Sequence, residues 1–115
     1  MHAASSYSLE ARHADVVAVA VKSLTGQILR KLATEAIRGR SLILQTHYYK
    51  VTVSTEIPGV PKDFVYANAK KIFDKVFQEV EGFGFFKYRR KFVSETTIEV
   101  RLYFTDDIVF KYSCH

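Results

Sequence analysis

Side chains that commonly bind metals or act as nucleophiles are few in this sequence, and they are not spaced for either task. None of the four histidines stands three or four residues from another histidine or from the single cysteine, the spacing that places two metal ligands on one helix face. That cysteine, Cys114, is next to the last residue of the sequence, where a preorganised thiolate pocket is not expected. We therefore predict no metal site, no cofactor and no cysteine-based catalysis.

Acidic residues and glycines also lack a catalytic pattern. Asp106 and Asp107 are adjacent in a predicted tight turn, where they bond to the local backbone better than they share a proton. Gly82-Phe83-Gly84 follows a predicted helix and precedes a predicted strand, the reverse of the order that holds a phosphate at a helix N-terminus. Because no nucleophile, base and orienting group occur together, we expect a binding protein rather than an enzyme.

Basic residues and tyrosines that recur at every second position are the pattern best suited to chemistry. Side chains two apart in a strand share one face of a sheet. Basic groups attract phosphates in a salt-dependent manner, and tyrosine rings are surfaces on which unpaired bases stack. We predict a sheet face that binds nucleic acid, single-stranded or structured rather than duplex, and consists of Tyr48, Lys50, Lys87, Arg89, Lys91, Arg101, Tyr103 and Lys111.

Two other interpretations of these residues stay open. Lysine, arginine and tyrosine are ordinary occupants of the solvated face of an antiparallel sheet, where lysines on edge strands also discourage aggregation. Alternatively, the chain is a protein-binding or self-assembling subunit, such as an inhibitor, adaptor or homo-oligomer, that acts through its helices or a sheet edge. The seven tyrosines and nine phenylalanines suit such an interface.

The overall composition is that of one globular domain. A chain of 115 residues with 48% hydrophobic and 25% charged residues can bury its own core. Its formal charge of +5 suits an anionic partner. The lone cysteine indicates a reducing compartment, and the longest apolar run, residues 16–21, is too short for a membrane span. We expect a single cytoplasmic domain over residues 1–115, with a flexible N-terminus at 1–8 and no membrane association.

Helical spacing of apolar residues predicts a helical segment over residues 9–38. Gly26 interrupts the apolar stripe, and Thr25 could cap a second segment, so we expect one kinked helix or two helices that break near residues 23–26. The alternation at residues 16–21 also fits a buried strand. The stripe itself consists of Val17, Val21, Leu24, Ile28 and Leu32.

A strand and a second helix are predicted next. Residues 41–56 are rich in β-branched and aromatic types, and their apolar positions change from even to odd, which predicts a bulge near Thr46 or His47. The helix is expected at about residues 62–81, ending at Gly82. Its buried stripe should contain Val65, Ala69, Ile72, Phe73, Val76, Phe77 and Val80.

Three alternating segments then predict three strands between residues 82 and 114. In the first strand, Phe86, Tyr88 and Phe92 share the apolar face. Arg90 interrupts that face, and it either extends past the sheet edge or pairs with a helix carboxylate.

Loop lengths set the expected register of these strands. A three-residue loop at 94–96 places Arg89 opposite Arg101, and one at 105–107 places Arg101 opposite Lys111. Opposed like charges cost a few tenths to about 1 kcal/mol per pair, so such a row indicates an anionic ligand. A two-residue slip of the first hairpin would instead pair Arg89 with Glu99.

The predicted fold is therefore α+β. One strand and a C-terminal three-stranded meander form a four-stranded, mostly antiparallel sheet. The N-terminal helix or helix pair and the second helix pack on one face of it, and the opposite face is left to solvent or a partner.

Overall fold

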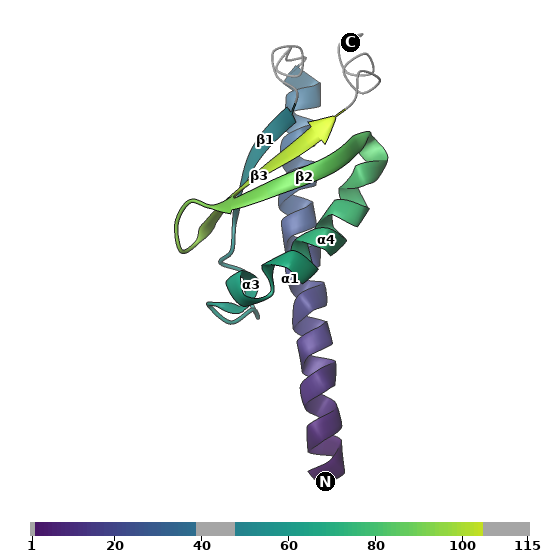
Figure 1. Ribbon diagram of the computed structural model, residues 1–115, viewed down its shortest axis with the longest axis vertical. Coiled ribbons are helices and arrows are strands. Elements are labelled where there is room, and N and C mark those ends of the chain that lie inside the picture. The colour runs from purple at the N-terminus through teal and green to yellow at the C-terminus, as the bar shows by residue number, and fades with distance from the viewer. Residues whose placement is uncertain (1, 39–47, 105–115) are drawn as a thin grey trace.

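The computed structural model describes the backbone of residues 2–38 and 48–104 and the side chains of residues 12–34 and 48–103. Three strands form an antiparallel sheet in the order β1-β3-β2, and a long helix and a shorter one accompany it (Figure 1). The α+β class is thus confirmed, whereas the predicted fourth strand lies outside the described residues. The elements are α1 (His2–Arg38), β1 (Tyr48–Ser54), α3 (Phe64–Ala67), α4 (Ala69–Val80), the 3-10 turn η1 (Glu81–Phe83), β2 (Phe85–Phe92) and β3 (Thr97–Phe104).

Helix α1 is one continuous helix, and Figure 1 shows it nearly straight along its length. The predicted kink or break near residues 23–26 is therefore wrong, as is the strand alternative for residues 16–21. Gly26 costs a helix only about 1 kcal/mol relative to alanine, and the fully buried side chains of Leu24 and Ile28 on either side offset that cost. Residues 2–8 have a helical backbone, and their flexibility stays a prediction.

The second helical segment is divided, contrary to the single helix that we predicted. It separates at Asn68 into α3 and α4, where the backbone leaves helical geometry with φ −120° and ψ 25°, and the Asn68 side chain donates a hydrogen bond to the Phe64 carbonyl at 2.9 Å. Asparagine competes with helical backbone bonding in this way. The predicted buried stripe is nevertheless confirmed, from Val65 to Val80, with Phe77 only half-buried.

The first hairpin has the predicted register. Arg89 lies opposite Arg101 and Lys91 opposite Glu99, and the Val93 N–H donates to the Thr97 carbonyl at 3.0 Å to close the loop. The alternative with a two-residue slip is therefore wrong.

A β-bulge at the start of β2 overturns the predicted position of Phe86. The register shifts between Phe85 and Lys87, so Phe85 is buried and Phe86 is 59% exposed. Gly84, with φ 105°, turns the chain into this strand in a conformation that suits glycine. Beyond the bulge, Tyr88 and Phe92 return to the half-buried positions that the alternation predicts.

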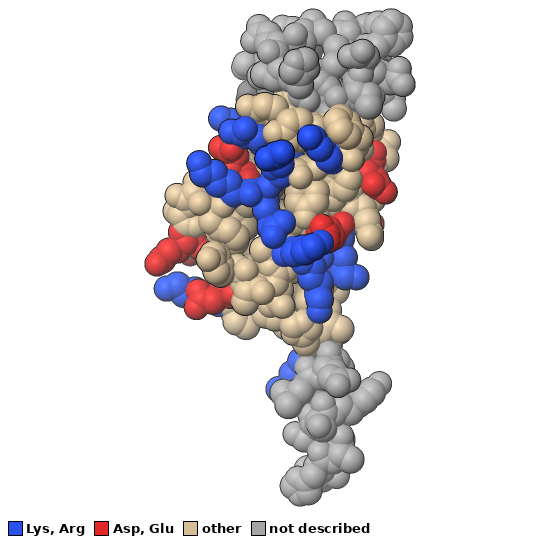
Figure 2. Space-filling model, viewed as in Figure 1, with Lys and Arg blue, Asp and Glu red and all other residues tan. Residues whose placement is uncertain are grey.

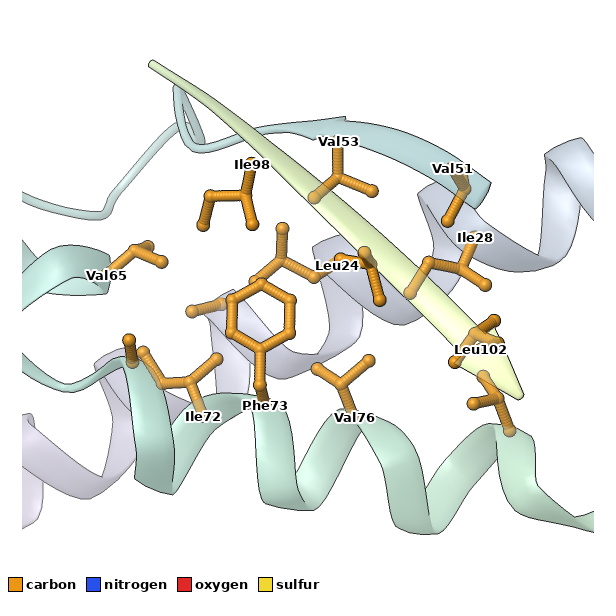
Figure 3. Packing of buried hydrophobic residues seen from close by; sticks show 14 of the residues in the cluster. Leu24, Ile28, Val51, Val53, Val65, Ile72, Phe73, Val76, Ile98 and Leu102 are labelled. Carbon is orange, nitrogen blue, oxygen red and sulfur yellow. The ribbon is translucent and has the colours of Figure 1, made fainter. Parts of the chain in front are cut away.

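Strand β1 alternates as expected, with Tyr49, Val51 and Val53 buried. The predicted bulge near Thr46 or His47 and the first half of that strand lie outside the described residues. Inner-face side chains of the sheet meet those of both helices in one core, where Leu24, Ile28, Ile72, Phe73, Val76, Val51, Val53, Ile98 and Leu102 converge (Figure 3).

Polar groups of α1 bind the edge of β1 that does not pair with β3. The Gln27 side chain accepts a hydrogen bond from the Ser54 N–H at 2.8 Å and donates one to the Ser54 carbonyl at 3.0 Å. Lys31 donates to the carbonyl of Thr52, which precedes Ser54 by two residues and lies on the same edge of the strand. Helix α1 thus supplies bonds that a neighbouring strand would otherwise make.

We expect Gln27→Ala to lower the free energy of unfolding by about 1 to 2 kcal/mol, because two partly buried hydrogen bonds to Ser54 are lost together. Urea denaturation measures this difference. Gln78→Ala, at an exposed position of α4, is the matched control and should change stability little. Equal effects of the two substitutions would contradict a stabilising role for Gln27.

Candidate nucleic-acid interface

The outer face of the sheet is organised as rows of directly opposed residues, one from each strand, with β3 in the centre. Alternation keeps the side chains of each row on the same face, because residues directly opposite in a ladder point the same way. Three consecutive rows make up what we call the basic face: Tyr48, Tyr103 and Lys87; Lys50, Arg101 and Arg89; and Thr52, Glu99 and Lys91.

All the predicted binding residues except Lys111 lie on this basic face, and Lys111 lies outside the described residues. The predicted pairing of Arg101 with Lys111 is wrong, because β3 has β1 on one side and β2 on the other. On the side of β3 that pairs with β1, the residue opposite Arg101 is Lys50. The like-charge row therefore exists, with Lys50 where Lys111 was expected.

Positive charge dominates the basic face. Lys50 and Arg89 are exposed, whereas the side chain of Arg101 is 40% exposed between them. Glu99 is the only carboxylate in the three rows, and it accepts a hydrogen bond from Arg101 Nε at 3.0 Å, which raises the pKa of that guanidinium. Lysine and arginine side chains gather over the sheet in Figure 2.

Next to this row the surface is hollowed. A depression of about 420 Å³ is lined by Arg89, Arg90, Lys91, Glu99 and Arg101. Arg89, Lys91 and Arg101 belong to the outer rows, and three cations around a shallow hollow can bind a phosphate group from several sides, arginine with two parallel hydrogen bonds.

Two tyrosines lie side by side at one end of the basic face. The rings of Tyr48 and Tyr103 have centroids 5.2 Å apart. The Arg101 guanidinium lies 4.9 Å from the centre of the Tyr48 ring, and Lys87 Nζ lies 4.8 Å from that of Tyr103. The rings and cations therefore form one interleaved surface, in which the cations are already attracted to aromatic faces.

A second aromatic cluster lies beside β2, and the sequence reasoning missed it. Tyr66 of α3 is 70% exposed, and its ring lies 4.8 Å from that of Phe92. Together with Tyr88, Arg89 and Arg90, these rings line a shallow hollow of about 640 Å³. In the sequence, Tyr66 falls on the polar side of the predicted helix. An aromatic residue at such a solvent-facing position was the signal that could have identified it as a candidate contact residue.

Arg90 is exposed and reaches the carboxylate of Asp74 only through Tyr88, so the predicted direct pairing with a helix carboxylate is not what the structure has. Arg90 donates a long hydrogen bond of 3.5 Å to the Tyr88 hydroxyl, which itself donates to Asp74 of α4 at 2.7 Å. Lys70, Tyr88 and Arg90 all lower the pKa of Asp74. Burial and the bond to Asp74 raise the pKa of Tyr88 to about 12.

Other kinds of site find no support in the described part of the chain. No three histidine, cysteine, aspartate or glutamate side chains of these residues gather as a set that could hold a metal ion. None of the described helices combines the length and apolar character that crossing a membrane requires.

Comparison with known proteins yields no relative. No protein-family model, no curated protein and no solved structure matches the chain. The function must therefore be inferred from the geometry of the basic face.

We expect Arg89→Glu to raise the free energy of unfolding by a few tenths to about 1 kcal/mol at low ionic strength, because a carboxylate would then lie opposite Arg101. Lys91→Glu should have the opposite effect, because it places two carboxylates opposite each other at Glu99. Urea denaturation at low salt measures both, and the difference should shrink at about 1 M salt. A loss of stability in Arg89→Glu would show that Arg89 is already neutralised in the free protein.

The stability of the protein should fall between about pH 10 and pH 12 as a result of Tyr88 ionisation. Its folded-state pKa lies above its ordinary value of 10.0, so the stabilisation is present below pH 10 and is lost as the pH rises. Urea denaturation from about pH 8 to about pH 11 should show the advantage of the wild type over Tyr88→Phe shrinking. Asp74→Asn should reduce this pH dependence, and parallel curves for wild type and Tyr88→Phe would contradict it.

Proposed function

We propose that the chain is a non-enzymatic nucleic-acid-binding protein whose basic face binds single-stranded or structured nucleic acid. The observation that carries this proposal is the row of Lys50, Arg101 and Arg89, which opposes like charges across three strands. Such a row destabilises the free protein and gains a favourable interaction when phosphates lie along it.

The shape of the basic face favours a single strand over a duplex. The major groove of DNA, about 12 Å wide, admits a helix or a two-stranded ribbon, whereas this face is three strands across. A single strand can lie across the sheet, with phosphates along the cationic row and bases toward the tyrosines.

The tyrosine pair supplies the surface for bases. Tyr48 and Tyr103 are half-buried, so their rings are held by the sheet while one side of the pair remains accessible. A base that stacks on either ring would compete with Arg101 or Lys87, and the displaced cation would be close to the phosphate of the same strand. Base–aromatic stacking contributes about 1 to 3 kcal/mol per base.

Fluorescence anisotropy with labelled single-stranded and double-stranded DNA and RNA, over a salt series, tests the proposal. We expect salt-sensitive binding that is tighter for the single strands. Lys50→Ala with Arg89→Ala should weaken it by about tenfold or more at low salt, and should reduce the slope of log affinity against log salt by about 1.4, for two lost phosphate contacts.

Lys71→Ala with Lys75→Ala is the matched control, because it removes the same charge from α4, away from the sheet. It should leave the salt slope nearly unchanged. Equal losses in the two double variants would mean that only net charge matters, and unchanged binding in Lys50→Ala with Arg89→Ala would refute the basic face as the site.

A protein-binding function is the second candidate, and it would use a different surface from the nucleic-acid proposal. The observation that favours it is a groove between α1 and α4, which none of the strands lines.

A further inference from the structure

Helices α1 and α4 pack beside one another, and an open groove of about 970 Å³ runs between them. Its walls come from these two helices alone among the described elements. On α1 it extends from His13 to Arg30, which corresponds to about 26 Å of helix at 1.5 Å per residue. The groove is therefore as long as a helix of about 18 residues.

The floor of this groove is apolar. Ala14, Ala18, Val21 and Leu29 line it at intervals of four, three and eight, which is the spacing of one helix face. Val21 and Leu29 are only half-buried, although they pack against the core, and Ala18 is exposed. This stripe lies beside the fully buried one, so α1 has more apolar surface than the sheet and α4 cover.

The rim of the groove is basic. Lys22 and Arg30 of α1 and Lys71 and Lys75 of α4 line it, against a single carboxylate, Glu79. Lys22, Arg30, Lys71 and Lys75 are all exposed. Cations on both sides of an apolar floor form a pattern that an apolar stripe with acidic flanks complements.

We infer that this groove binds an amphipathic helix of a partner protein, with acidic residues on both sides of its apolar stripe. The small side chains of Ala14 and Ala18 allow a third helix to approach closely. A second copy of this chain fits less well, because its α1 and α4 would bring a further set of lysines and arginines against this rim. A polynucleotide would leave the apolar floor without a matching surface.

The inference is independent of the proposed nucleic-acid function. No residue that lines the groove belongs to the three rows of the basic face. Either surface can therefore be altered while the other is measured.

A display library of 18-residue helical peptides tests the inference. Each peptide has a fixed stripe of leucine and alanine, and the flanking positions are randomised among Glu, Lys and Gln. Selection on the wild-type protein should enrich Glu over Lys at the flanks. The affinity of a selected peptide, measured by anisotropy, should fall at least tenfold in Lys71→Glu with Lys75→Glu.

Matched variants separate the groove from general effects of charge and size. Ala18→Arg, at an exposed position of the floor, should also reduce peptide binding at least tenfold, whereas Ala33→Arg, exposed on α1 beyond the groove, should not. Lys50→Glu with Arg89→Glu should leave peptide binding within about twofold, and circular dichroism should show that every variant is folded.

Several results would overturn the inference. These are no enriched peptide, enrichment of Lys at the flanks, or binding that Ala18→Arg and Ala33→Arg affect equally. If light scattering gives twice 13.2 kDa for the wild type and 13.2 kDa for Ala18→Arg, the groove binds a second copy of the chain instead. Loss of oligonucleotide binding in Lys71→Glu with Lys75→Glu, without loss in the basic-face variant, would assign it to nucleic acid.

Discussion

The attachment of α1 to β1 is the interaction on which the rest of the structure depends. Strand β1 has β3 as its only strand neighbour among the described residues, so half of its backbone groups need partners elsewhere. Gln27 supplies two of those partners at Ser54, and Leu24 and Ile28 are fully buried in the core that the sheet and the helices share. Because α1 holds β1 in this way, Lys50 of that strand is kept opposite Arg101, and the like-charge row is formed despite its electrostatic cost.

The two edges of the sheet are protected differently, and this bears on what the positive charges are for. Helix α1 binds the outer edge of β1, whereas β2 has exposed Arg89, Arg90 and Lys91 and pairs only with β3 among the described strands. Charged side chains on an open edge discourage pairing with strands of other chains. This effect alone can explain the positive charges on β2. That reason does not extend to Arg101 on the central strand or to Lys50 beside a covered edge. Arg101 also bonds to Glu99 within the protein, so Lys50 is the stronger sign of an anionic ligand.

The features that could be predicted from the sequence are those set by residues close together in the chain. Period-two alternation and a three-residue loop were enough to place Arg89 opposite Arg101, because a short hairpin sets its own register. Lys50 could not be placed in the row, because β1 joins β3 across about 50 residues of chain and no local rule selects that neighbour. The errors at Gly26, Asn68 and Phe86 have different origins. At Gly26 the burial of neighbouring side chains outweighs a weak helix former, at Asn68 a side-chain bond competes with the backbone, and at Phe86 a bulge that the alternation does not reveal shifts the register.

The basic face and the α1–α4 groove are both positively charged, so their ligands would interact through space as well as through the fold. The strength of this interaction depends on electrostatic screening. The Debye length is about 8 Å at physiological ionic strength, and a packed layer of core side chains lies between the sheet and the helices (Figure 3). An acidic helix in the groove would lower the net charge of +5 and weaken nucleic-acid binding at low salt, where the field of the whole protein acts at long range. At physiological salt each site would respond mainly to its own side chains. If both proposals hold, the separation of the two sites by the packed core would permit simultaneous binding, with a coupling that depends on salt.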